Sequence, residues 1–222
     1  MDRWPMTAAE AEAVQDRLRP RVRPGGEPLR PRTVAGLDVS YATGSDRLAA
    51  AVVVLDADTL EVVEASVVDG TAAFDYVPGL LAFREIPSLL TALDRLAVTP
   101  DVLVCDGYGV AHPRRFGLAC HLGVLTDLPA IGVAKTPFTW AYEPPGQRRG
   151  DWSPLVGDGE ELGRVLRTRD GVRPVFVSTG HRVTLGSACD LVLRLCPRYR
   201  LPETTRLADR LSRHRLARVP AG

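Results

Sequence analysis

The chain has 222 residues, of which 45% are hydrophobic and 25% charged, and its formal net charge is +1. This length suits one domain, and the hydrophobic share is enough for a buried core, which excludes a mainly disordered chain. Residues 1–5 lack the basic and then apolar pattern of a signal peptide, and no apolar run reaches the ~20 residues that span a bilayer. We therefore expect a cytoplasmic protein with no membrane partner. A monomer is the default expectation, since nothing in the sequence indicates an oligomeric state.

The chain is also unusual in its basic residues. Of the 28 basic residues, 27 are arginine and one is lysine, Lys135. A chain so rich in arginine retains lysine where a compact point charge does what a planar guanidinium does not. We expect Lys135 to be functional, the alternative being a surface lysine retained by chance. Arginines also gather at 17–32 and 194–218, where they either contact phosphates or cover solvated surface.

The N-terminal part of the sequence predicts a helix followed by three strands. Thr7 and Glu10 form a capping box for a helix over 7–18, and Pro20 ends it. Residues 21–31, rich in Pro, Gly and Arg, read as an arm. Three apolar, β-branched runs at 33–40, 48–55 and 61–68 then predict an antiparallel meander.

Helices and short buried strands alternate in the rest of the chain. We expect helices over 78–96, 116–125 and 187–195, and strands over 102–105, 130–134 and 175–178, with an exposed loop over 142–159. Strands joined through helices must be parallel, so the meander continues into a mixed sheet with flanking helices. The simplest arrangement is an α/β, ribonuclease H-like fold.

Three carboxylates interrupt these elements where apolar residues would be expected. Asp38 lies within the first strand, Asp106 ends the fourth, and Glu85 lies on the helix between them. In the expected fold the first and fourth strands are adjacent, so the three acids can converge. Close carboxylates repel by roughly 4 kcal/mol per pair at an effective dielectric near 20, which a cation relieves. Oxygen ligands favour Mg²⁺, with Mn²⁺ as a substitute, and such ions support phosphodiester hydrolysis.

The neighbours of these acids resemble endonuclease V. The segments that carry the resemblance are GLDVSY at 36–41, YVPGLLAFRE at 76–85, DGYGVAHPRRFG at 106–117, IGVAK at 131–135, GHRV at 180–183 and YRLPE at 199–203. The similarity implies a catalytic domain over 33–216, preceded by a helix and arm at 1–32 and followed by a tail at 217–222. It also implies a deoxyinosine nuclease that cuts DNA at the second phosphodiester bond 3′ of the lesion, leaving 3′-hydroxyl and 5′-phosphate, and so initiates repair. Inosine in RNA is an alternative substrate.

The resemblance also assigns roles to individual residues. Asp38, Glu85 and Asp106 match the metal-binding acids, and Lys135 matches a lysine near the scissile phosphate. Asp209 falls where members of the family carry His or Asp close to the metal.

A wedge and a base pocket are implied beside these acids. The wedge, which fills the gap left by an extruded base, is matched by Tyr76, Val77 and Pro78; the alternative is an ordinary turn before a helix. The expected pocket residues are Gly79, Leu81, Gly107 and Gly117. In such a pocket a backbone N–H would donate to the O6 of hypoxanthine and reject the amino group of adenine.

Three residues of the 106–117 segment are candidates for contact with the nucleic acid. His112 is expected either to contact phosphate or to organise the pocket, and otherwise to be a loop histidine bonded to backbone. Arg114 and Arg115 are expected to hold the substrate backbone.

Two other functions are alternatives that explain the sequence less completely. Another ribonuclease H-like nuclease, such as a junction resolvase or a hybrid nuclease, would share the acids but would not need the wedge or the glycines. A non-catalytic nucleic-acid binder would be expected to have lost an acid, whereas all three are present.

Overall fold

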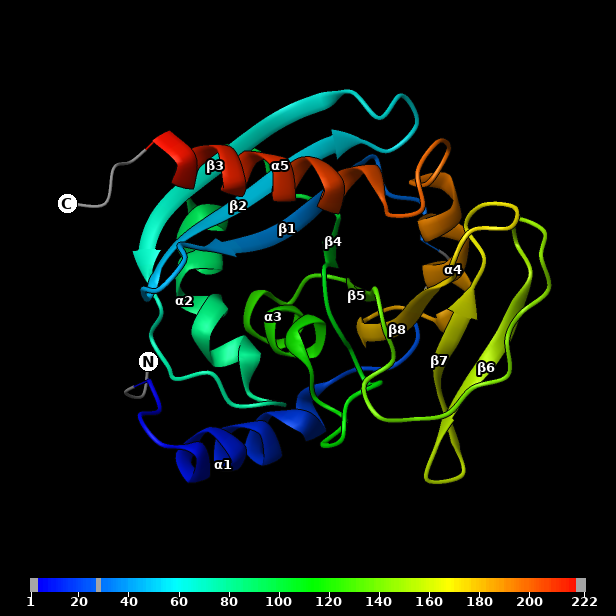
Figure 1. Cartoon of the computed structure of the whole chain (residues 1–222), viewed down its shortest axis with the longest axis horizontal. Coiled ribbons are helices and arrows are strands. Elements are labelled where there is room, and N and C mark those ends of the chain that lie inside the picture. The colour runs from blue at the N-terminus through cyan, green and yellow to red at the C-terminus, as the bar shows by residue number, and fades with distance from the viewer. Residues whose placement is uncertain (1–3, 27–28, 219–222) are drawn as a thin grey trace.

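The fold is given by a computed structural model, which describes residues 4–26 and 29–218 (Figure 1). Of the predicted tail at 217–222, residues 219–222 lie outside the described part, as do residues 1–3 of the N-terminal segment. Within the described ranges, no helix is long and apolar enough to cross a membrane.

Eight strands in this part of the chain form one sheet in the order β3-β2-β1-β4-β5-β8-β7-β6. The strands are β1 (Thr33–Tyr41), β2 (Arg47–Asp56), β3 (Val62–Thr71), β4 (Val102–Cys105), β5 (Ala130–Ala134), β6 (Trp152–Gly157), β7 (Glu160–Leu166) and β8 (Val175–His181). The helices are α1 (Ala8–Leu18), a short 3-10 turn η1 (Arg19–Arg21), α2 (Leu81–Asp94), α3 (Leu118–Thr126), α4 (Leu185–Arg194) and α5 (Glu203–Arg218).

The predicted ribonuclease H-like arrangement is confirmed. Strands β1, β2 and β3 pair antiparallel as a meander, and β4 then pairs parallel with β1 on one side and with β5 on the other. Strand β8 joins β5 antiparallel and makes the sheet mixed. Strands β1 and β4 are therefore adjacent and central, as the positions of their carboxylates required.

Helices cover both faces of this sheet. Apolar residues of α2 and α3, including Ile86, Leu89 and Leu122, pack with β1, β2 and β4 in one core cluster. On the other face, α4 packs on β4, β5 and β8, while α5 lies across the meander, with Ala208 against β2. Figure 1 shows α5 crossing β1, β2 and β3 on that face.

The predicted exposed loop at 142–159 was partly wrong, because β6 lies within it. Strand β6 alternates exposed and buried residues, and it turns into β7 through Asp158 and Gly159, which both have positive φ angles of 54° and 81°. An Asp-Gly pair between alternating residues is a hairpin signal. Pro154 obscured this signal, but proline is tolerated here because β6 is the edge strand of the sheet.

Candidate active site

The register of β1 and β4 brings the first two acids together. These parallel strands pair from Val34 with Val102 to Leu37 with Cys105, so Asp38 and Asp106 are the next residues along two neighbouring strands. Neighbouring strands lie about 4.8 Å apart. Both carboxylates therefore stand at the carboxyl ends of central parallel strands, where α/β sheets commonly place their sites.

Helix α2 supplies the third acid from the side. Glu85 is only 7% exposed, and its Oε1 accepts a hydrogen bond of 3.3 Å from the Tyr41 hydroxyl. Burial, with the charges of Asp38 and Asp106 added to it, raises the pKa of Glu85 to about 8. The site therefore disfavours the charged form of Glu85 unless positive charge is present.

Helix α5 reaches Asp38 from the opposite face of the sheet. The buried Ser212 hydroxyl donates a 2.7 Å hydrogen bond to Asp38 Oδ2 and lies 2.7 Å from the Ser40 hydroxyl. Burial raises the pKa of Asp38 to about 6, the Ser212 bond opposes this shift, and the charges of Asp106 and Asp209 add to it.

A glycine allows α5 to come this close. A Cβ on Gly36 of β1 would lie 2.1 Å from the backbone carbon of Thr204, at the start of α5, so any side chain there would push the helix away. The same helix carries Asp209, whose Oδ1 is 2.8 Å from Arg213 Nε. The charge of Asp209 also acts on Asp38, and Asp209 lines the same cavity as the other three acids.

The single lysine, Lys135, lies beside these acids. Lys135 follows β5 directly, and its Nζ bonds Asp106 Oδ2. Burial is the largest single influence and lowers the pKa of Lys135, but the bond to Asp106 and the charges of Asp106, Asp38 and Asp209 together outweigh it and raise the pKa. The backbone of Lys135 is held as well, since Arg200 Nη2 donates a 2.7 Å bond to its carbonyl oxygen.

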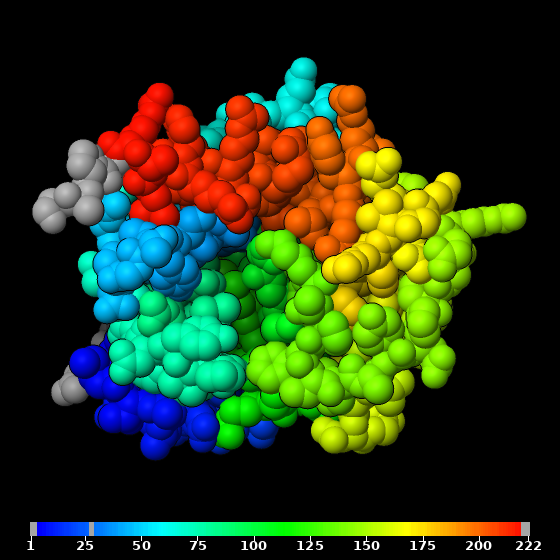
Figure 2. Space-filling view, in the orientation of Figure 1, coloured from blue at the N-terminus to red at the C-terminus, as the bar shows by residue number. Residues whose placement is uncertain are grey.

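These side chains line one cavity of about 740 Å³. Its walls include Asp38, Glu85, Asp106, Lys135 and Asp209, together with Arg213 of α5. Figure 2 shows the molecule hollowed at the centre of this face, below α5. All four predicted acids and the lysine thus face one open space.

A second cavity of about 510 Å³ adjoins the first and shares Asp106, Leu118 and Lys135 with it. The residues that line only this second cavity are Tyr76, Pro78, Gly79, Leu81, Ala82, Gly107, Tyr108, His112, Gly117, Ala134, Thr136, Pro137 and Phe138. The four expected pocket residues are therefore brought together, beside two of the three expected wedge residues. Val77 of the wedge packs instead with Phe74, Leu80 and Phe83.

His112 fastens two walls of this second cavity to each other. Its Nδ1 accepts a 3.2 Å bond from the Arg114 N–H, so its Nε2 carries the proton and donates to the Gly79 oxygen at 2.9 Å. Burial lowers the pKa of His112 to about 4, which keeps the ring neutral. Gly79 has a φ of 86°, in the left-handed region that favours glycine. Of the roles expected for His112, this geometry fits both the organiser of the pocket and the loop histidine bonded to backbone.

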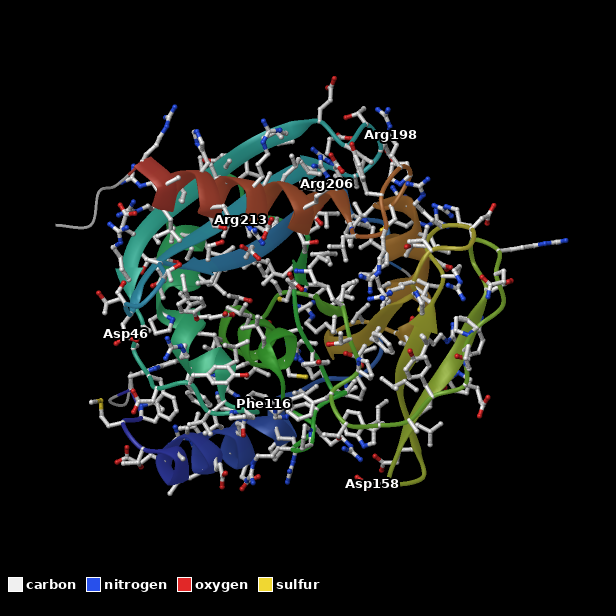
Figure 3. All side chains as sticks on the ribbon, viewed as in Figure 1. Asp46, Phe116, Asp158, Arg198, Arg206 and Arg213 are labelled. Atoms are coloured by element: carbon white, nitrogen blue, oxygen red, sulfur yellow. The ribbon has the colours of Figure 1, made fainter. Side chains whose placement is uncertain are left out.

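Arg114 and Arg115 line neither cavity. Arg114 pairs with Asp16 and, at 3.6 Å, with Glu12 on α1. Arg115 pairs at 2.8 Å with Asp158, which Figure 3 shows at the tip of the β6–β7 hairpin. Both guanidinium groups therefore hold the 112–117 loop to neighbouring elements.

Two residues of the site escaped the sequence analysis. Phe138 lies between Tyr108 and His112, with ring centroids 5.3 and 5.4 Å away, and forms an aromatic wall of the second cavity. Ser212 bonds Asp38. A serine on the arginine-rich helix α5 carries no signal of its own. Phe138, three residues after the only lysine, could have been considered as a base-stacking residue.

The donor set fits a hard divalent cation in its chemistry. Four carboxylates line the first cavity, and burial raises the pKa of Asp38 and of Glu85. Within residues 4–26 and 29–218, no three acidic, histidine or cysteine side chains are close enough to share one ion as they stand. Lys135 on Asp106 and Ser212 on Asp38 occupy oxygens that an ion would otherwise take.

Comparison with known proteins agrees with this geometry. A family model described as Endonuclease V matches residues 16–210, which include all four acids, Lys135 and both expected walls of the pocket. The chain belongs to the endonuclease V family. Membership of this family makes it a nuclease.

Relatives within the endonuclease V family cover nearly the whole chain. Endonuclease V from Streptomyces avermitilis is 59% identical over 221 residues, which are 98% of this chain and 96% of the relative. A crystal structure of endonuclease V from that organism has a TM-score of 0.93 at 58% identity, and covers 96% of this chain and 95% of that chain. Endonuclease V from Ciona intestinalis, solved with a 24mer DNA containing an inosine followed by a ribo-adenosine, has a TM-score of 0.82 at 27% identity, over 96% of this chain and 98% of that chain.

Proposed function

We propose that this nuclease recognises deoxyinosine in DNA and hydrolyses the second phosphodiester bond 3′ of it, leaving 3′-hydroxyl and 5′-phosphate. The observation that carries the proposal is the pair of adjoining cavities, one lined by acids and one by glycines and aromatic rings, with Asp106, Leu118 and Lys135 in common. A single strand that crosses this shared wall would present a base to one cavity and a phosphate to the other. The activity would start the repair of deaminated adenine.

Asp38, Glu85 and Asp106 would hold Mg²⁺, for which Mn²⁺ can substitute, with Asp209 beside them. The ion supplies the positive charge that activates water and stabilises the leaving 3′ oxygen in phosphodiester hydrolysis. Lys135 stands between the cavities and would bind the scissile phosphate, since its ammonium group is a compact donor. Ser212 would keep Asp38 oriented throughout.

Recognition of the lesion falls to the second cavity. Tyr76 is 69% exposed at the rim and would occupy the gap left by the extruded base, with a stacking gain of roughly 1–3 kcal/mol. The loop before it is anchored, because Arg84 Nη1 donates a 2.7 Å bond to the Phe74 oxygen. Hypoxanthine differs from adenine in carrying an O6 acceptor, which a backbone N–H in the pocket would select. The inosine-containing DNA in the Ciona intestinalis structure supports this substrate.

Cleavage of matched oligonucleotides tests the proposal. Strands that differ only in inosine or adenine at one position are incubated with Mg²⁺ or with EDTA, as single-stranded DNA, duplex DNA and RNA. We expect Mg²⁺-dependent nicking at the inosine strand alone, and the RNA arm determines whether inosine in RNA is also a substrate. Equal cutting of inosine and adenine would refute the proposed specificity.

A single substitution then tests the acids. Asp106→Ala should abolish nicking and retain the fold and much of the affinity for the inosine strand. Undiminished cleavage would refute the site, and binding by the wild type without Mg²⁺-dependent nicking would favour a non-catalytic binder.

A further inference from the structure

A buried glutamine on α1 touches the walls of the second cavity from behind. Gln15 is 1% exposed, and its Nε2 donates hydrogen bonds to the Gly79 oxygen at 3.1 Å and to the Phe116 oxygen at 3.2 Å. Both acceptors are carbonyl oxygens, so only the amino side of the carboxamide can serve them. One side chain thus fixes the positions of two backbone groups.

Those two backbone groups belong to two different segments that line the pocket. Gly79 is the turn between the wedge and α2, and Phe116 immediately precedes Gly117, a lining residue. Figure 3 shows Phe116 between α1 and α3. Gly79 is also the acceptor for His112, so its carbonyl receives two donors from two different segments. The bonds from Gln15 and His112 therefore hold the wedge turn at Gly79 against the 112–117 loop.

Gln15 leaves one of its own polar atoms unsatisfied. Its Oε1 is buried without a hydrogen-bond partner in the described part of the chain. An unpartnered buried carbonyl is unfavourable, whereas the two bonds that Nε2 donates satisfy backbone oxygens that an apolar side chain would leave without them. The bonds to Gly79 and Phe116 are therefore what holds a carboxamide at this position.

The rest of α1 is attached to the same segments. Arg114, from the 112–117 loop, pairs with Asp16 and Glu12 of α1. In the segment just before α1, Trp4 Nε1 donates a 3.0 Å bond to the Phe83 oxygen on α2. Ala11 packs with Phe74, Leu80 and Phe83, beside the wedge. Helix α1 therefore contacts the wedge side and the loop side of the pocket together, although the family model begins only at residue 16.

We propose that Gln15 is a positioning residue for lesion recognition, and that α1 is the brace through which it keeps the wedge turn and the 112–117 loop at the spacing that an extruded base requires. This inference rests on the proposed function for its substrate. Gln15 does not line the acid cavity, so its effect falls on binding of the lesion and leaves the bond-breaking step alone.

The test compares Gln15→Met with Thr7→Ala. Methionine keeps the length and volume of glutamine and removes both donors. Thr7 is the N-cap of α1, and its side chain accepts from the Glu10 N–H far from the pocket, so its loss weakens the helix and leaves both Gln15 bonds intact. The two variants separate a positioning role from general helix stability. Gln15→Asn, too short to reach both carbonyls, is a second variant for the case in which Gln15→Met does not fold.

Two measurements are made on each variant. The first is kcat and KM on inosine and adenine strands. For Gln15→Met we expect KM for the inosine strand to rise about tenfold, which is equivalent to about 1.4 kcal/mol, with kcat changed by less than about threefold. The second is hydrogen exchange of the Leu80 amide in the free protein. That amide donates to the Val77 oxygen inside the wedge turn, and its exchange should be faster in Gln15→Met than in Thr7→Ala.

The outcomes are distinguishable from those of the proposed function. If the wild type cuts inosine strands and both variants show the same KM and the same Leu80 exchange as each other, the brace is refuted and the proposed function stands. If the wild type does not cut inosine strands, the proposed function fails, and the exchange of Leu80 still decides whether Gln15 holds the wedge turn.

Discussion

Replacing Glu85 by Gln should make the metal-free protein more stable at neutral pH, even though it removes a proposed metal ligand. Burial raises the pKa of Glu85 from 4.5 to about 8, so between these values the folded chain binds a proton that the unfolded chain releases. The stability of the wild type therefore falls as pH rises through this window. At about 1.4 kcal/mol per pKa unit, the loss by pH 7 is on the order of 3 kcal/mol. Glutamine cannot ionise and can still accept the bond from Tyr41.

Urea unfolding in EDTA, at several pH values across that window, measures the effect. We expect wild type and Glu85→Gln to be equally stable at the acidic end and to diverge toward the alkaline end, with the variant more stable. Added Mg²⁺ should raise the stability of the wild type by more than that of the variant.

A control of opposite sign is available on β3. Backbone N–H bonds from Ala97 and Val98 lower the pKa of Glu64, so its carboxylate contributes stability above its ordinary pKa that is lost as pH falls. Glu64→Gln should therefore be less stable than the wild type at neutral pH. Parallel curves for wild type and Glu85→Gln from acid to alkaline pH would refute the reasoning about the buried carboxylate.

Three further substitutions test separate parts of the site. A Cβ on Gly107 would meet only Leu118, at 3.7 Å, so Gly107→Ala should leave the melting temperature nearly unchanged. Because the added methyl group fills part of the pocket, steady-state kinetics should show KM for inosine strands raised about tenfold. Lys135→Ala should lower kcat about a hundredfold or more and preserve inosine-strand binding in a gel-shift assay; an unchanged kcat would remove Lys135 from the reaction. The Ser212 bond lowers the pKa of Asp38, so Ser212→Ala should raise that pKa and move the acidic limb of the pH–rate profile to higher pH.

The convergence of the acids was predictable because it follows from chain topology. Asp38 and Asp106 follow apolar runs that had to become neighbouring parallel strands, and their register places them side by side. The position of Glu85 near them was predictable because the helix that carries it connects the meander to the strand that Asp106 ends. Lys135 was found because it is the only lysine in the chain. In each case a pattern along the sequence implied a position in space.

The remaining features depend on the direction of side chains, which sequence pattern does not fix. The contacts of Arg114 and Arg115 with the substrate backbone stay a prediction, whereas the ion pairs of their guanidinium groups with α1 and with the β6–β7 hairpin carried no signal in the sequence. Ser212 and Gln15 acquire their roles only from elements that pack against them from distant parts of the chain. Such contacts span 174 residues for Ser212 with Asp38 and 64 for Gln15 with Gly79.

The shared wall of the two cavities has a consequence for where the strand is cut. Asp106 and Leu118 belong to one short segment, tied at both ends to β4 and α3, so the proposed lesion-binding cavity and the proposed hydrolytic cavity cannot move independently. On the proposed function, the fixed spacing of the two cavities would set the number of nucleotides between the recognised base and the broken bond. Altering the rim would then change how fast a strand is cut, while the cut itself would stay at the same distance from the lesion in every sequence context.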